Sequence, residues 1–295
     1  MSNKIFSISS AFVLGASFAV ADVPKVAVDI APVHSLVSKV MNGLGKPNLI
    51  IPSEASPHEY QLRPSEAKAL QEAKLVFWIG EDLTPWLEKG LSTLAKDATI
   101  TTLLKADGIE LLDFREGALF EAHDHSDHDD HDDHDDHDHG KHKKKDDHDD
   151  HEGHDHGEHD PHAWLSPGIA KVWLNLIAAK LSEVDPVNAS TYFSNASSAS
   201  KDLDSLSDEI NKILDPIRKE KFVVFHDAYQ YFEKHFNISA SGAISLGDAS
   251  DPSPARLKEI KERVEKEDIH CVLAEPQYNE GLVKAVIEGT HANNA

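Results

Sequence analysis

Histidine and aspartate alternate through residues 122–162 with almost no apolar side chain between them. The tract reads AHDHSDHDDHDDHDDHDHGKHKKKDDHDDHEGHDHGEHDPH. Imidazoles and carboxylates at this density are potential metal ligands. A segment of this composition cannot bury enough apolar surface to offset its ordering entropy, so we expect a mobile loop. Its metal sites should be weak, multiple and interchangeable, formed by His123, His125, His128, His131, His134, His137, His139, His142, His148, His151, His154, His156 and His159.

Two interpretations of the tract remain open at this stage. It is either a solvated spacer with incidental metal affinity or a loop that scavenges or senses metal. In both cases acidic pH would release the metal, because imidazoles protonate around their reference pKa of about 6.5.

Three histidines stand apart because each lies beside an expected structural element. His58 lies in the motif SPHEY after an expected strand, and His162 lies in DPHAW before an expected helix. His226 ends the apolar strand FVVF. A lone histidine near a strand end is usually a surface or hydrogen-bonded residue, and His34, His235 and His270 are interpreted in that way. For the first three, the alternative interpretation is a metal site.

The elements around these histidines alternate between strand and helix. We expect strands at 25–30, 48–51, 75–79, 99–104, 222–225 and 269–274, and helices at 33–44, 64–71, 83–94, 167–181, 187–214, 229–235, 254–264 and 280–288. Such alternation predicts an α/β protein with parallel sheets covered on both faces. The simplest architecture has two lobes of parallel-sheet βα units, joined by a long rigid helix, with a metal cleft between the lobes. Ligands of such sheets bind beyond the carboxyl ends of the strands.

The N-terminus is typical of a secretory signal peptide, because Lys4 is followed by an apolar run and by the cleavage motif Ala19-Val20-Ala21. No later run is long and apolar enough to span a bilayer. We therefore expect export to the periplasm and no membrane-spanning segment.

The predicted organisation of the chain has six parts. They are a signal peptide at 1–21, an N-terminal lobe at 22–121, the disordered loop at 122–160, an interlobe segment at 161–185, the connecting helix at 186–214 and a C-terminal lobe at 215–295.

Charge restricts the class of partner. The chain has 295 residues and a formal net charge of -23, and residues 121–160 hold 18 acidic residues against 4 lysines. The remainder is an ordinary, mildly acidic protein. This balance argues against nucleic acid and against anionic membrane surfaces, and it favours metal cations. The lone cysteine, Cys271, cannot form a disulfide within this chain, and we interpret it as a buried strand residue.

Four motifs in order resemble a known family. They are SPHEYQLRPSEAKALQEAKLVFWIG (56–80), DPHAWLSP (160–167), VVFHDAYQYFEKHF (223–236) and AEPQ (274–277). Together they are similar to the metal-binding solute receptors of bacterial ABC importers, and most of all to the periplasmic zinc receptors, which carry a His-rich loop at this place. The resemblance covers nearly the whole mature chain. It implies a monomeric binding protein, not an enzyme, that presents Zn²⁺ to a membrane ABC permease.

The resemblance also implies that His58, His162 and His226 are the metal ligands. Manganese receptors of the family tend to have a carboxylate where His226 stands. Three imidazoles suit zinc, and a tetrahedral site then needs one further group. The candidates are a water, Glu59 or a tract histidine. Glu59 could instead orient an imidazole, and Glu275 is either a residue of the cleft or a structural loop carboxylate.

The resemblance breaks down at the C-terminal end. The family usually supplies an aspartate ligand and the partner of its disulfide cysteine from a later segment, whereas this sequence ends in GTHANNA. We therefore expect a C-terminal lobe that lacks at least one strand, so that either the chain is a truncated product or another group closes the site.

Two other functions are weighed. One is a metal buffer that acts through the tract. The other is a zinc-dependent hydrolase in which three histidines and a water form an open catalytic site. The hydrolase is disfavoured because the sequence has no HExxH motif and no pair of candidate general bases at a suggestive spacing.

Overall fold

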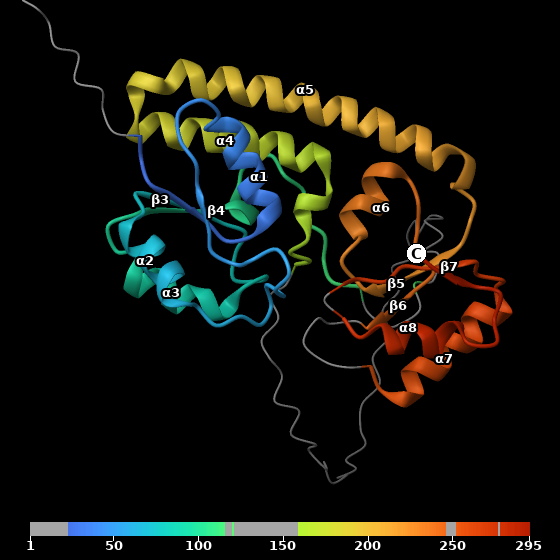
Figure 1. Cartoon of the computed structure of the whole chain (residues 1–295). Helices are drawn as coiled ribbons and strands as arrows, with labels where there is room; N and C mark the ends of the chain where they lie inside the picture. The colour runs from blue at the N-terminus through green and yellow to red at the C-terminus, as the bar shows by residue number, and fades with distance from the viewer. Residues whose placement is uncertain (1–22, 116–119, 121–158, 246–251, 277) are drawn as a thin grey trace, which may run out of the picture.

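The computed structural model describes residues 23–115, 120, 159–245, 252–276 and 278–295 (Figure 1). The expected signal peptide at 1–21 lies outside the described residues. So does most of the tract, including the predicted accessory ligands from His123 to His156. His159 and the residues that follow it are described. In the described part of the chain, no helix is long and apolar enough to cross a membrane.

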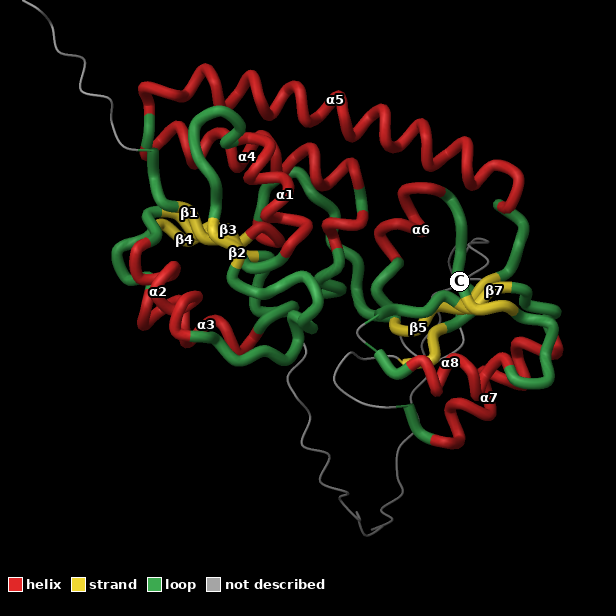
Figure 2. Tube along the Cα trace, viewed as in Figure 1, coloured by secondary structure: helices red, strands yellow, loops and turns green. Residues whose placement is uncertain are grey.

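The first lobe is built on a four-stranded parallel sheet with the order β2-β1-β3-β4. The strands are β1 (Val26–Val28), β2 (Asn48–Leu49), β3 (Leu75–Trp78) and β4 (Thr99–Thr102). Helix α1 (Ala31–Val40) lies on one face, and α2 (Pro64–Glu72) and α3 (Pro85–Leu94) lie on the other (Figure 2). Helices α2 and α3 begin with Pro64 and Pro85, and Pro32 is the second residue of α1; the fixed φ of proline suits the first turn of a helix.

The second lobe repeats this plan with the strand order β6-β5-β7-β8, also parallel. The strands are β5 (Phe222–His226), β6 (Ala243–Ser245), β7 (Cys271–Val272) and β8 (Asn293–Asn294). Helix α6 (Gln230–Phe236) lies on the face toward the long helix, and α7 (Pro254–Lys266) and α8 (Glu280–Ile287) cover the opposite face (Figures 1 and 2).

The lobes are connected by a helical pair. Helix α4 (Pro167–Val184) packs on the first lobe, and the 26-residue α5 (Ala189–Leu214) extends over both lobes (Figure 1). At 1.5 Å per residue α5 is about 39 Å long. Its first half is anchored by the buried side chains Tyr192, Ala196 and Ala199. Short 3₁₀ turns lie between these elements: η1 (Leu103–Lys105), η2 (Ala163–Leu165), η3 (Pro186–Asn188) and η4 (Asp215–Ile217).

Separate apolar cores support the two lobes. One core contains the first sheet, α4 and the buried face of α5, and another contains Val223, Phe225 and Val272 of the second sheet with Ile260 and Val286 from α7 and α8. The predicted fold class, parallel α/β lobes joined by a long helix, is confirmed. Strand β8 was not predicted, because its two asparagines have no apolar pattern.

Candidate metal centre

The three predicted histidines converge where the lobes meet. His58 comes from the loop before α2, His162 directly precedes η2, and His226 is the last residue of β5. The ring centroids of His58 and His162 are 5.6 Å apart, and those of His162 and His226 are 5.3 Å apart. His162 and His226 are buried, with 3% and 6% of their surface exposed, and His58 is half-buried.

These spacings suit imidazoles that share one ion. Two imidazoles on a tetrahedral zinc have ring centroids about 5.2 Å apart, since Zn–N is about 2.1 Å and the ring centre lies about 1.1 Å behind the nitrogen. The donor nitrogens, however, do not form a complete metal-binding group in this structure. Among the described residues, no group of three or more His, Cys, Asp or Glu side chains has the geometry to hold a metal ion. The structure thus provides the ring spacing and not a converged ligand set.

A buried carboxylate binds the Nδ1 side of His162. Asp160 Oδ1 lies 2.6 Å from His162 Nδ1, and it also accepts a 2.9 Å hydrogen bond from the His162 backbone N–H. Asp160 has no exposed surface, and its Oδ2 accepts a 3.1 Å hydrogen bond from Gln230 Nε2. An ionised Asp160 requires the proton on Nδ1, which leaves the Nε2 lone pair for a metal.

His226 has an equivalent partner. Glu275 Oε1 lies 2.5 Å from His226 Nδ1, and 9% of the Glu275 side chain is exposed. Glu275 follows β7, so the contact joins the ends of two adjacent strands. Glu59, in contrast, is exposed to solvent. Of the two carboxylates named from the sequence, Glu275 is the one that contacts a site histidine.

Aromatic side chains contact His162 and His226. The Trp164 ring stands edge-on to His162 with a centroid separation of 5.1 Å. Tyr278 lies 5.4 Å from His226 and stacks on Phe225 at 4.4 Å. Burial, followed by the charge of Glu275, raises the pKa of Tyr229 to about 12, so this phenol stays neutral at physiological pH. Trp164 and Tyr278 thus each contact one of the two buried imidazoles.

Asp160 and Tyr278 were not predicted from the sequence as residues of the site. Asp160 had a local signal, because an aspartate two residues before a histidine can reach that residue's own backbone and ring, as the motif DPH does here. Tyr278 had no such signal, because its contact with His226 depends on the path of the chain after β7.

Four other histidines of the described part of the chain lie outside the centre. His34 Nε2 is 3.2 Å from the Pro47 carbonyl, and His235 Nδ1 is 3.5 Å from Ser166 Oγ. His270 pairs with Glu220, and His159, the tract histidine that is described, pairs with Asp113 at 2.8 Å. All four have partners away from the three site imidazoles.

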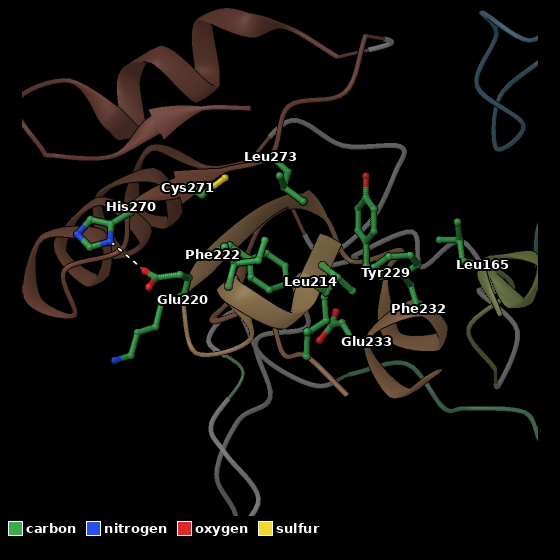
Figure 3. A pocket seen from close by; sticks show the side chains of 13 residues that line it. Leu165, Leu214, Glu220, Phe222, Tyr229, Phe232, Glu233, His270, Cys271 and Leu273 are labelled. Carbon is green, nitrogen blue, oxygen red and sulfur yellow. Dashed lines mark hydrogen bonds and ion pairs between the residues drawn. The ribbon is translucent and has the colours of Figure 1, made fainter. Parts of the chain in front are cut away.

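A separate apolar cavity lies in the second lobe (Figure 3). Its volume is about 480 Å³, and Leu214, Phe222, Phe232 and Leu273 line it together with Cys271. Cys271 lies in β7 as expected but is half-buried, and burial raises the pKa of its thiol. None of the three site histidines lines this cavity, and its apolar walls offer little to a metal ion.

The chain is similar to known zinc-uptake proteins over most of its length. Residues 26–295 match the family model described as zinc-uptake complex component A, periplasmic. The high-affinity zinc uptake system protein ZnuA of Brucella abortus is 44% identical over 270 residues, covering 90% of this chain and 81% of that protein. ZnuA of Paracoccus denitrificans is 45% identical over 271 residues, covering 92% of this chain and 81% of that protein.

Solved structures share the fold. A crystal structure of ZnuA has a TM-score of 0.70 at 22% identity, covering 92% of this chain and 89% of that one. A zinc-bound ZnuA deletion mutant has a TM-score of 0.69 at 22% identity, covering 92% of this chain and 88% of that one. At this level of identity the structures support the architecture alone.

Proposed function

Because the chain belongs to the family of periplasmic zinc-uptake complex components A, we propose that it captures Zn²⁺ in the periplasm and delivers it to a membrane ABC permease. It is a transport receptor and not an enzyme. Zinc is therefore cargo that must be bound tightly and later released.

We propose that His58, His162 and His226 bind the ion through Nε2. The ring spacings of 5.6 Å and 5.3 Å carry this assignment, since they approach those of imidazoles on one tetrahedral ion. The carboxylates on the Nδ1 side of His162 and His226 add support, because metal-bound histidines almost always donate their other N–H to such a group.

The fourth position is open to a water or to Glu59. Glu59 is exposed and adjacent to His58, so its carboxylate has no competing buried role. Glu275 is a positioning group in this proposal, because its Oε1 is already bound to His226. Three nitrogen ligands favour zinc over manganese, which prefers oxygen.

Finer features of the receptor are part of the same proposal. Residues 1–21 act as the export signal, and the mature chain works as a monomer. The lobes correspond to 22–121 and 215–295, with 161–185 and 186–214 between them. The separate apolar cores support the two lobes, and the span of α5 supports a connecting helix; α4, within 161–185, packs into the core of the first lobe. The tract histidines are accessory ligands of low affinity.

Zinc titration in competition with a chelator tests the ligand assignment. The mature chain should bind one equivalent tightly, and His58→Ala, His162→Ala and His226→Ala should each weaken that site by at least about tenfold. His270→Ala is the matched control, because this exposed histidine pairs with Glu220 on the second lobe. If all three variants retain the affinity of the unaltered chain, the ligand assignment is wrong.

A further inference from the structure

A buried ion cluster lies beside the metal centre. Arg115 leaves the first lobe, and its guanidinium binds two carboxylates of the second. Nε lies 2.9 Å from Asp227 Oδ1 and 3.0 Å from Asp227 Oδ2, and Nη2 also donates to Oδ1. Nη1 and Nη2 donate to Glu233 at 3.0 Å and 2.9 Å. Only 3% of the Asp227 side chain and 7% of the Glu233 side chain are exposed.

The two carboxylates come from elements that carry the site. Asp227 directly follows His226 at the end of β5, and Glu233 lies on α6. The Oε2 atom of Glu233 also accepts a 3.0 Å hydrogen bond from the Ala240 backbone N–H. Arg115 therefore joins the carboxyl end of β5, the helix α6 and the loop before β6 in one network.

The segment before Arg115 also contacts the group that orients His162. The backbone N–H of Asp160 donates a 2.8 Å hydrogen bond to the Leu112 carbonyl. The Tyr231 hydroxyl on α6 donates to the Asp160 carbonyl at 2.9 Å and accepts from the Leu112 N–H at 3.0 Å. Gln230 Nε2 contacts both Asp160 Oδ2 and the Asp113 carbonyl at 3.1 Å. Residues 112–115 thus link Asp160, the partner of His162, to Asp227, the neighbour of His226.

The chemistry of this cluster requires an arginine. The planar guanidinium can bind two carboxylates at once with parallel hydrogen bonds, whereas a lysine ammonium is a point charge. It also packs 3.5 Å from the ring centroid of Phe120. Buried ion pairs add little net stability, and their best-attested use is to specify geometry. Here the geometry is the placement of one lobe's strand end against the other lobe.

We propose that Arg115 is a positioning residue for the zinc site. It binds Asp227 and Glu233 of the second lobe, and the segment that carries it also contacts Asp160. In this way Arg115 sets the distance of His226 from His162. This inference rests on the proposed function of the three histidines. The alternative is a merely structural cluster, in which Arg115 neutralises two buried carboxylates without affecting the ring spacing.

Three variants separate these roles: Arg115→Met, Arg115→Lys, and the triple variant Arg115→Met/Asp227→Asn/Glu233→Gln. The triple variant removes the cation and both buried charges together. Lys234→Met is the matched control, because Lys234 also joins α6 to this segment through Glu110, but at an exposed position. Three quantities are measured: zinc affinity by chelator competition, the visible spectrum of the Co²⁺-substituted protein, and thermal unfolding of the metal-free protein.

We expect Arg115→Met to weaken zinc binding by at least about tenfold and to alter the Co²⁺ spectrum at temperatures where the protein is folded. The triple variant should regain thermal stability but neither zinc affinity nor the spectrum, and the control should match the unaltered chain. Arg115→Lys should keep the fold with intermediate affinity, which preserves the test if Arg115→Met does not fold.

Two results would overturn the inference. One is unaltered zinc affinity and spectrum in a folded Arg115→Met or Arg115→Lys variant, and the other is recovery of both properties in the triple variant. Either result leaves the ligand assignment intact. If the unaltered chain itself lacks a tight zinc site, the proposed function fails and this inference fails with it.

Discussion

His162 and His226 lie with their ring centroids 5.3 Å apart although one is anchored beside the core of the first lobe and the other in the sheet of the second. His162 precedes η2, whose Ala163 belongs to the first core, and His226 ends β5 of the second sheet. Each ring is bound on its Nδ1 side by a buried or nearly buried carboxylate. The centre therefore depends on the fixed relation between the lobes as much as on its own side chains.

Replacing Glu275 with alanine should weaken zinc binding by about 10- to 100-fold, the usual effect of removing a carboxylate that orients a metal-bound histidine. The reason is that His226 Nδ1 loses its 2.5 Å partner, so neither the tautomer nor the ring orientation is held. Chelator competition measures the affinity, and ¹⁵N spectra of the imidazole report the tautomer. Glu280→Ala is the control, since this exposed glutamate pairs with Lys284. An unchanged affinity together with an unchanged tautomer would argue against the orienting role.

Much of the fold could be predicted because local patterns determine it. The strand at Leu75–Trp78 is a continuous apolar run, and prolines mark the first turns of α2 and α4. Strand β8 could not be predicted, since Asn293 and Asn294 are held by backbone pairing with β7 and not by side-chain burial.

The residues of the site could likewise be predicted only in part. The three histidines stand out through their motifs and their positions at loops or strand ends. The partnership of Glu275 with His226 depends on two strands that are adjacent in the sheet but distant in the chain. Arg115 likewise meets Asp227 and Glu233 only when the lobes are assembled. No periodicity or spacing in the sequence indicates these pairings.

Deletion of residues 122–158 should leave one tight zinc site and remove the weaker binding equivalents. This follows because the proposed ligands lie outside the deleted stretch, and because the tract has no fixed spacing that could define a strong site. Calorimetric titration of both proteins would give the number of sites in each affinity class. If the tight site disappears with the tract, the metal-buffer interpretation is favoured over the three-histidine centre.

Asp29 should make stability depend on pH. Burial raises its pKa from 3.8 to about 7, against the opposing effect of hydrogen bonds from the backbone N–H groups of Ile79 and Ile30. A folded-state pKa above the unfolded one gives stability that is fully present below the unfolded value and is lost as pH rises through 7. Relative to Asp29→Asn, the unaltered chain should therefore lose up to about 4 kcal/mol between about pH 4 and pH 7, at about 1.4 kcal/mol per pKa unit.

Urea unfolding of the two metal-free proteins across this pH range measures the effect. Histidine titration is common to both proteins, so it cancels in the difference between their free energies of unfolding. A difference that stays constant with pH would mean that Asp29 has the same pKa in the folded and unfolded chains.

Replacing His226 with aspartate should shift metal preference from zinc toward manganese. The substitution exchanges an imidazole nitrogen for a carboxylate oxygen, and oxygen ligands suit Mn²⁺ better than nitrogen does. It also removes the acceptor-donor pair with Glu275 and brings two carboxylates together, which further favours a hard cation. We expect zinc affinity to fall and the ratio of zinc to manganese affinity to fall by at least about tenfold, measured by competition titration with both ions. His270→Asp makes the same chemical change at an exposed position of the same lobe, so it should leave the ratio unchanged. An unchanged ratio in His226→Asp would show that metal preference is set by groups other than this ligand.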